Sequence, residues 1–146
     1  YIEVKIMSNI NIVYATMTKH SKKLAEAIGT ELNVKAQNVK ENVILDDTDM
    51  LFIVGGLYSG DSLPLLLGFS KNLDSQRVKK AVLITSSVSK KKGQDSIRKT
   101  LVDKGIEVMD EFFCYGSFLF FKFGHPNKDE IQQAVNFALK VIKNLN

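Results

Sequence analysis

Short apolar runs alternate along this chain with segments of helical spacing, and this alternation restricts the fold more than any other property of the sequence. Residues 10–14, 50–57 and 81–85 are largely apolar and rich in β-branched and aromatic side chains. Such runs are typical of strands buried on both faces of a sheet. Apolar residues recur at helical spacing after each of them, in residues 22–32, 63–73 and 94–104. Strands that alternate with helices predict a parallel sheet with helices on both faces and right-handed crossovers.

Three further segments complete the expected order of elements. Residues 34–39 alternate apolar and polar side chains, which is typical of an edge strand with one polar face, and residues 106–113 are predicted to form another strand. Residues 129–145 carry apolar side chains on one side of a final helix. The five strands fit the order 2-1-3-4-5, in which a ligand binds at the carboxyl ends of the strands where the order reverses. Residues 16–21 and 55–61 would then face each other.

The turn at residues 16–21 has the properties of a phosphate site. It joins the carboxyl end of a strand to the amino end of a helix, where backbone N–H groups and the positive end of the helix dipole converge. Thr16, Thr18 and Ser21 add hydroxyl donors. The alternative is that Thr18 or Ser21 only caps the helix.

Length and composition are those of one globular domain. With 146 residues, 45% of them hydrophobic, the chain can bury a substantial core. A single cysteine excludes an internal disulfide and fits a reducing cytoplasm. No apolar run approaches the roughly 20 residues of a membrane span, and the basic start does not predict a signal peptide. Met7 is expected to be the natural initiator, with residues 1–6 as an extension of a domain that spans residues 7–146.

The basic residues give the chain a net charge of +4. Apart from the run at residues 90–92 the lysines are scattered and are not interleaved with aromatic residues, so nucleic-acid binding is not expected. Two histidines and one cysteine without ligand spacing do not predict a zinc site. Cys114 follows an apolar strand, has no second cysteine nearby, and is expected to be a buried thiol.

The segment TMTKHS at residues 16–21 resembles the phosphate loop of flavodoxins, a Ser/Thr-x-Thr-Gly-x-Thr pattern after the first strand. The resemblance implies that the 5′-phosphate of FMN is held by Thr16, Met17, Thr18, Lys19, His20 and Ser21. Lys19 stands where the family usually has glycine, and His20 where asparagine is common. If this position needs a positive φ, Lys19 costs roughly 1 kcal/mol; otherwise Lys19 adds a charge near the phosphate. His20 either donates to the phosphate or lies on the surface.

The segment GGLYSGDSLP at residues 55–64 resembles the flavin-contacting loop of short, clostridial-type flavodoxins. The resemblance implies that the flavin ring is flanked by Leu57, Tyr58, Ser59, Gly60 and Asp61. In that family a Gly-Asp peptide faces N5 of the flavin and flips on reduction, and Gly60 with Asp61 matches this dipeptide. The three glycines of the segment are expected to permit close backbone approach and positive φ values. The alternative is a plain glycine-rich loop with a half-buried Tyr58.

The segment after the strand at residues 81–85 resembles the other flavin-flanking loop, which implies that Ser86 and Ser87 lie opposite, across the ring. No aromatic residue occurs between Thr85 and Gly93. Either Tyr58 stacks alone or one face of the ring stays open. The lysine run in this segment contacts the ring or a partner, or is solvated surface, which is the more frequent role of such a run.

The segment EFFCYGSFLFFKFGHPNKDEIQQAVNFA is similar to the EF-x-C-x-G … GHPN segment of small bacterial flavodoxin-family proteins, so the resemblance covers nearly all of the chain from Met7. It implies an α/β fold of three layers, a flavodoxin-like doubly wound parallel five-stranded sheet in the order 2-1-3-4-5. It also implies a cytoplasmic, monomeric, FMN-binding electron carrier that donates electrons to a partner oxidoreductase and needs no catalytic side chain. Flavodoxins are usually acidic, so the positive net charge implies a partner with an acidic docking face.

Two other functions stay open at this point. An FMN-dependent NAD(P)H or quinone reductase is motivated by the missing second stacking aromatic. An accessory subunit with weak or lost FMN binding, which activates a partner enzyme, is motivated by Lys19 and by the reversed net charge. Resemblance of fold does not separate these three functions.

Overall fold

A parallel sheet forms the centre of the computed structural model, which describes residues 9–15, 19–58, 61–87, 93–115 and 128–145. Its strands lie side by side in the order β2 (Ala36–Asn38), β1 (Ile10–Tyr14), β3 (Thr48–Tyr58), β5 (Val78–Ser87) and β6 (Glu107–Tyr115). Each neighbouring pair among them is parallel. When these five strands are counted along the chain, the order across the sheet is 2-1-3-4-5, which confirms the predicted doubly wound fold.

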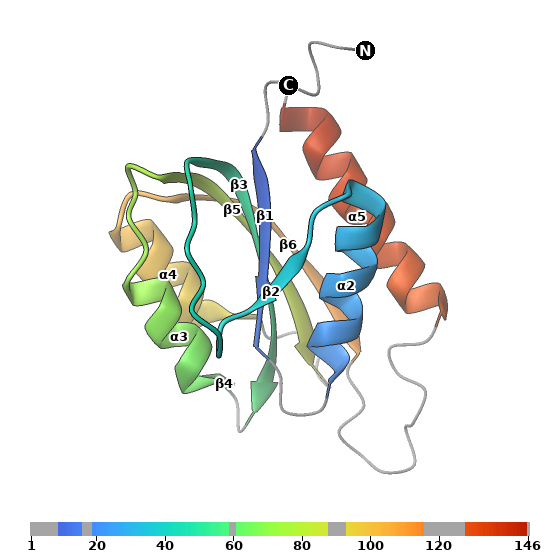
Figure 1. The fold of residues 1–146 in the computed structure, drawn as a ribbon. Helices are drawn as coiled ribbons and strands as arrows, with labels where there is room; N and C mark the ends of the chain where they lie inside the picture. The colour runs from blue at the N-terminus through green and yellow to red at the C-terminus, as the bar shows by residue number, and fades with distance from the viewer. Residues whose placement is uncertain (1–8, 16–18, 59–60, 88–92, 116–127, 146) are drawn as a thin grey trace.

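Helices cover both faces of this sheet (Figure 1), in the pairs α2 (His20–Leu32) with α5 (Lys128–Leu145) and α3 (Pro64–Lys71) with α4 (Asp95–Asp103). On β3, Phe52 belongs to the apolar core beneath α2 and α5, whereas Leu51 and Ile53 belong to the core beneath α3 and α4. Successive residues of a strand point to opposite faces. The central strands therefore need apolar side chains at every position, and this explains their continuous apolar sequence.

The structure differs from the predicted elements at their ends and in one short strand. α2 begins at His20, earlier than expected, and β2 is shorter than the predicted edge strand. The sequence did not predict β4 (Asp61–Ser62), which pairs antiparallel with Leu57 and Tyr58 at the end of β3. A strand of two residues is too short to show the alternation by which strands are recognised.

The described residues carry neither a membrane-spanning helix nor a metal-binding cluster. None of their helices is long and apolar enough to cross a bilayer. No three of their His, Cys, Asp or Glu side chains come together as a metal ion would require. Cys114 is buried in β6, as the sequence predicted.

Candidate functional site

The carboxyl ends of β1, β3 and β5 form the edge of the sheet at which the predicted site lies, at the bottom of Figure 1. Ala15, just after β1, donates its N–H to the Val54 carbonyl of β3 at 3.3 Å. Gly56 of β3 pairs with Ser86 of β5. The strand order reverses between β1 and β3, which is where doubly wound sheets bind their ligands. The pairing therefore brings the described ends of all three predicted segments to one edge.

The helix that follows β1 begins with a left-handed residue. Lys19 is the N-cap of α2, with a φ of 71° and a ψ of 0°. An L-residue in this conformation costs roughly 1 kcal/mol, because its Cβ crowds the backbone carbonyl. This position therefore has the positive φ that the sequence left open, and Lys19 carries its steric cost. The Lys19 side chain is exposed, and its carbonyl accepts a hydrogen bond from the Lys23 N–H at 3.0 Å.

The first turn of α2 is unusual in its charge. No side chain caps the helix at Lys19, and no acidic residue lies in the first turn. Lys22 and Lys23 are exposed there instead, although cations near a helix N-terminus are unfavourable by about 0.3–1 kcal/mol each. Ser21 lies inside the turn and not at the cap, so the interpretation that it merely caps the helix is wrong. This end of α2 is suited to an anion.

Ser21 gives the clearest indication of a ligand at this edge. Its side chain is fully buried, and its hydroxyl makes no hydrogen bond within the part of the chain that the structure describes. A buried polar group without a partner costs about 1–3 kcal/mol. A phosphate at the helix N-terminus would supply the missing acceptor, so the described residues fit the phosphate of FMN. The neighbouring His20 is half-buried, and Thr16, Met17 and Thr18 lie outside the described residues.

The flavin-flanking segment predicted at residues 57–61 is described in part. Leu57 is half-buried, and Tyr58 of β3 pairs with Asp61 of β4. Asp61 is exposed, and its Oδ1 accepts a hydrogen bond from the Ser62 N–H at 2.8 Å. Outside the described part lie Ser59, Gly60 and the side chain of Tyr58. The pairing of β3 with β4, in which Leu57 lies opposite Ser62 and Tyr58 opposite Asp61, brings these predicted residues to one place at the end of β3.

The two serines predicted to lie opposite end β5. Ser86 is 6% exposed and pairs with Gly56 on one side and with Cys114 on the other. Ser87 pairs with Tyr115, and its side chain lies outside the described part of the structure, as do residues 88–92 with the lysine run. The end of β5 therefore lies between the ends of β3 and β6.

Gly55 serves close packing and not a left-handed backbone. A Cβ at this position would lie 2.4 Å from Cδ2 of Leu66 and 3.0 Å from Oε1 of Gln94. The close neighbours of this glycine are thus the Leu66 and Gln94 side chains. Among the described glycines Gly105 alone has a positive φ. The expectation of positive φ values at Gly55 and Gly56 is therefore wrong.

Two buried polar side chains near this edge were not predicted. Ser62 is 6% exposed, and its hydroxyl makes no hydrogen bond to any described residue. Gln94, the N-cap of α4, is fully buried, and its Oε1 also has no partner among the described residues. Ser62 follows the Gly-Asp dipeptide and Gln94 precedes an amphipathic helix. Neither position carries a sequence pattern that separates a buried polar side chain from an exposed one.

Comparison with known sequences gives one informative relative. No family model matches the chain. It is similar to an uncharacterized protein of Methanocaldococcus jannaschii, with 28% identity over 138 residues. The matched residues span 86% of this chain and 92% of the relative, so the similarity concerns most of both proteins.

Comparison with solved structures identifies the fold. A short-chain flavodoxin associated with a bacterial microcompartment has a TM-score of 0.67 at 18% identity, over 96% of this chain and all of that one (100%). A flavodoxin of Streptococcus pneumoniae TIGR4 has a TM-score of 0.65 at 16% identity, over 92% and 98% of the two chains. The flavodiiron protein of Giardia intestinalis has a TM-score of 0.66 at 13% identity, over 93% of this chain and 36% of that one. The protein therefore has the flavodoxin-like fold that its sequence predicted.

Proposed function

We propose that this protein binds FMN non-covalently at the carboxyl edge of its sheet and donates electrons to a partner oxidoreductase in the cytoplasm. The observation that carries the proposal is the buried Ser21 hydroxyl, which has no partner among the described residues and lies in an acid-free first turn of α2. The fold supports it, because this turn lies at the edge where doubly wound sheets bind their ligands. FMN, when bound, supplies the electron-transfer chemistry.

The residues of the chain hold and orient the cofactor in this proposal. Ser21 donates its hydroxyl to a phosphate oxygen, and the backbone N–H groups at the start of α2 donate to the same phosphate. Lys19 and Lys22 add electrostatic attraction. The remaining phosphate contacts come from Thr16, Met17, Thr18 and His20. The ring is flanked by Leu57, Tyr58, Ser59, Gly60, Asp61, Ser86 and Ser87.

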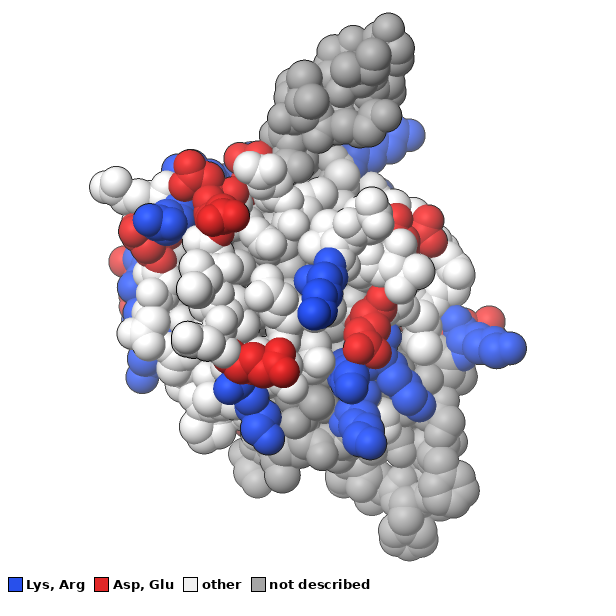
Figure 2. Space-filling view, viewed as in Figure 1, with Lys and Arg blue, Asp and Glu red and all other residues white. Residues whose placement is uncertain are grey.

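The partner is proposed to present an acidic face to a monomer of this protein. Lys19, Lys22 and Lys23 are exposed where α2 begins, and Figure 2 shows Lys and Arg side chains near the lower edge of the view, on the side of the site. Asp and Glu side chains lie among Lys and Arg side chains elsewhere in the same view. The lysines at the start of α2 would attract an acidic partner toward the site and speed its encounter.

A second candidate is an FMN-dependent NAD(P)H or quinone reductase. The observation that favours it is the absence of an aromatic residue from positions 85–93, which leaves no side chain of that segment to cover the second face of the ring. An open face would admit a nicotinamide or a quinone. The isolated protein with FMN would then oxidise NAD(P)H in the presence of a quinone, which an electron carrier does not do.

A third candidate is an accessory subunit with weak or lost FMN binding that activates a partner enzyme. The left-handed Lys19 favours it, because the roughly 1 kcal/mol of backbone strain lies within the proposed phosphate loop. The net charge of +4, opposite in sign to that usual for flavodoxins, favours it as well. Such a protein would stay colourless after FMN is added and removed.

Titration of the purified protein with FMN distinguishes the three candidates. FMN fluorescence and the visible spectrum are recorded during the titration and again after free FMN is removed. For the carrier we expect one FMN per chain with a Kd below about 1 μM, which is a binding free energy of about −8.2 kcal/mol, and no NAD(P)H oxidation. Retained FMN with NAD(P)H oxidation supports the reductase. A colourless protein contradicts both and supports the accessory subunit.

A further inference from the structure

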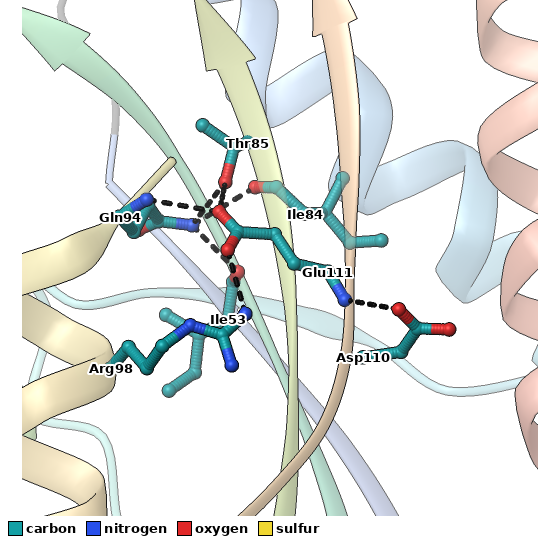
Figure 3. Close-up of polar contacts among 7 residues, drawn as sticks. All are labelled: Ile53, Ile84, Thr85, Gln94, Arg98, Asp110 and Glu111. Carbon is teal, nitrogen blue, oxygen red and sulfur yellow. Dashed lines mark hydrogen bonds and ion pairs between the residues drawn. The ribbon is translucent and has the colours of Figure 1, made fainter. Parts of the chain in front are cut away.

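A buried carboxylate on β6 connects that strand with β5 and with the start of α4 (Figure 3). The side chain of Glu111 is only 6% exposed. Its Oε2 accepts hydrogen bonds from Oγ1 of Thr85 at 2.5 Å and from the backbone N–H of Gln94 at 2.9 Å. Its Oε1 accepts from the guanidinium of Arg98 at 2.8 Å. Glu111 therefore binds one donor from β5 and two from α4 and its cap.

The side chain of Gln94 extends this cluster to β3. Its Nε2 donates to the Ile84 carbonyl and to Oγ1 of Thr85, both at 3.2 Å, and more weakly to the Ile53 carbonyl at 3.4 Å. Figure 3 shows the Gln94 amide between the strands that carry these acceptors. The Thr85 hydroxyl thus accepts from Gln94 and donates to Glu111. The four residues Thr85, Gln94, Arg98 and Glu111, here called the Glu111 cluster, join β3, β5, β6 and α4.

Gly93 packs against the Glu111 carboxylate and leaves no room for a side chain. A Cβ at Gly93 would lie 2.3 Å from Oε2 and 2.7 Å from Cδ of Glu111. No real side chain approaches a carboxylate so closely, so a larger residue would force Glu111 out of its place. The glycine lets the backbone before α4 lie directly against the carboxylate. The Glu111 carboxylate, the Gln94 backbone N–H that donates to it and the absence of a side chain at Gly93 therefore depend on one another.

The Glu111 cluster adjoins the proposed flavin site. Thr85 immediately precedes Ser86 and Ser87, the two serines proposed to face the ring. The other side of the Gln94 amide, its Oε1, lies against Gly55, in the segment that leads to Leu57. The cluster is thus bonded on β5 to Ile84 and Thr85, next to the two serines, and on β3 to the Ile53 carbonyl, in the strand that leads to Leu57.

Stability alone does not require such a cluster. A buried ion pair is often replaced by apolar side chains of similar volume without loss of stability, and most of the other buried side chains beneath α3 and α4 are apolar. Apolar contacts are not directional. Hydrogen bonds to a fixed carboxylate have defined lengths and angles, and they can hold two strand ends at one relative position.

We propose that Glu111 is a positioning residue for the flavin. It fixes the end of β5, and with it Ser86 and Ser87, relative to the end of β3. This proposal rests on the proposed function, because the positioned serines are those proposed to contact bound FMN. Glu111 does not itself touch the cofactor in this proposal. It acts through Thr85 and Gln94.

Three variants on β6 test the proposal. Glu111→Ala removes the acceptor, Glu111→Gln keeps one carbonyl acceptor without the charge, and Glu107→Gln is a matched control, because Glu107 is an exposed glutamate on the same strand. Three properties are measured for each variant: the Kd for FMN, the visible spectrum of the bound flavin, and amide hydrogen exchange of the FMN-free protein. The denaturation midpoint is recorded alongside them.

For Glu111→Ala we expect about tenfold weaker FMN binding and a shifted flavin spectrum. The amides of Ser86 and Ser87 should exchange faster, while those of β1 stay as in the wild type. For Glu111→Gln we expect partial rescue, with binding about threefold weaker than in the wild type. Glu107→Gln should match the wild type in all measurements.

The proposal is overturned if Glu111→Ala lowers the denaturation midpoint but leaves the Kd and the spectrum unchanged, because the cluster is then only structural. If the wild type does not bind FMN, the proposed function fails. Hydrogen exchange of the FMN-free Glu111→Ala protein then still tests whether Glu111 positions the end of β5. Unchanged exchange at Ser86 and Ser87 rejects this positioning, and faster exchange supports it. If Glu111→Ala does not fold, Glu111→Gln takes its place, because it removes the charge and keeps the shape of the side chain. A Glu111→Gln protein with wild-type Kd, spectrum and exchange would then reject the proposal.

Discussion

Two buried serines in helices show how a polar side chain that bonds within the fold differs from one that is proposed to bind a ligand. Ser70 of α3 and Ser21 of α2 are both fully buried. The Ser70 hydroxyl donates to the Leu66 carbonyl one turn earlier, at 3.0 Å. The Ser21 hydroxyl makes no hydrogen bond within the described residues. The sequence predicted Ser21 as a phosphate ligand from its place in a hydroxyl-rich turn, but it could not predict the burial.

Substitution of these serines should separate the two roles. For Ser21→Ala we expect FMN binding to weaken about tenfold, while the free energy of unfolding of the FMN-free protein stays unchanged or rises by up to about 1 kcal/mol, because an unpaired buried group is removed. For Ser70→Ala we expect the opposite result, with unfolding free energy lower by about 1 kcal/mol and FMN binding unchanged. Fluorescence titration and urea denaturation measure the two quantities. A Ser21→Ala protein that loses stability and keeps its Kd would contradict the assignment.

At the scale of helices and strands, the sequence predicted the buried strands more accurately than the turns. β3 and β5 are buried on both faces, so their continuous apolar runs were sufficient to identify them. The start of α2 and the short β4 depend on backbone turns, for which the residues involved gave no pattern. Lys19 is left-handed although lysine has no preference for that conformation.

The Glu111 cluster shows a different limit of sequence analysis. Thr85 and Glu111 are 26 residues apart in the chain, and Glu111 lies in a predicted strand without a neighbouring residue that marks it as buried. The cluster becomes visible only when the order of the strands brings β5 and β6 together. The hydroxyl-rich turn, by contrast, is contiguous in the sequence, so a role for it could be proposed from the sequence alone.

Replacement of the N-cap of α2 should release strain. For Lys19→Gly we expect the free energy of unfolding to rise by about 0.5 kcal/mol. Glycine removes the steric cost of the positive φ, but its larger conformational entropy in the unfolded state offsets part of this stabilisation. Asn33→Gly is the control at the other end of α2, where Asn33 has a φ of 57°. Asparagine tolerates this conformation, so its replacement should change stability less. Urea denaturation of the FMN-free proteins measures both effects, and a destabilised Lys19→Gly protein would show that Lys19 is not strained.

At the scale of the whole molecule, the exposed Lys22 and Lys23 lie where α2 begins, at the carboxyl edge. At the amino edge the exposed Asp46 and Asp47 line one hollow together with Arg77, so charges of both signs lie there. Charges farther apart than about 10 Å are largely screened at 0.1 M salt. The two lysines therefore act on partners that come close to the carboxyl edge.

The exposed Lys22 and Lys23 predict opposite salt responses for two inorganic acceptors of electrons from the reduced FMN-loaded protein. We expect the rate with the anion hexacyanoferrate(III) to fall several-fold as salt rises from about 0.01 to 0.15 M, and the rate with a cationic cobalt(III) complex to stay constant or rise. Stopped-flow absorbance measures both rates. The Lys22→Glu/Lys23→Glu variant should weaken the first response. Equal salt dependence for the two acceptors would contradict an edge that attracts acidic partners.

The sheet divides the interior into two cores that share no side chain, because each strand residue belongs to one face only. The Glu111 cluster lies on the α4 side, whereas the core beneath α2 and α5 contains a separate group of apolar side chains. Substitutions that have no common neighbours usually add in their effects on stability. Apolar substitutions within α5 can therefore accumulate without disturbing the geometry behind the proposed ring site. Selection could thus adjust the thermal tolerance of this protein and the redox properties of the proposed site independently.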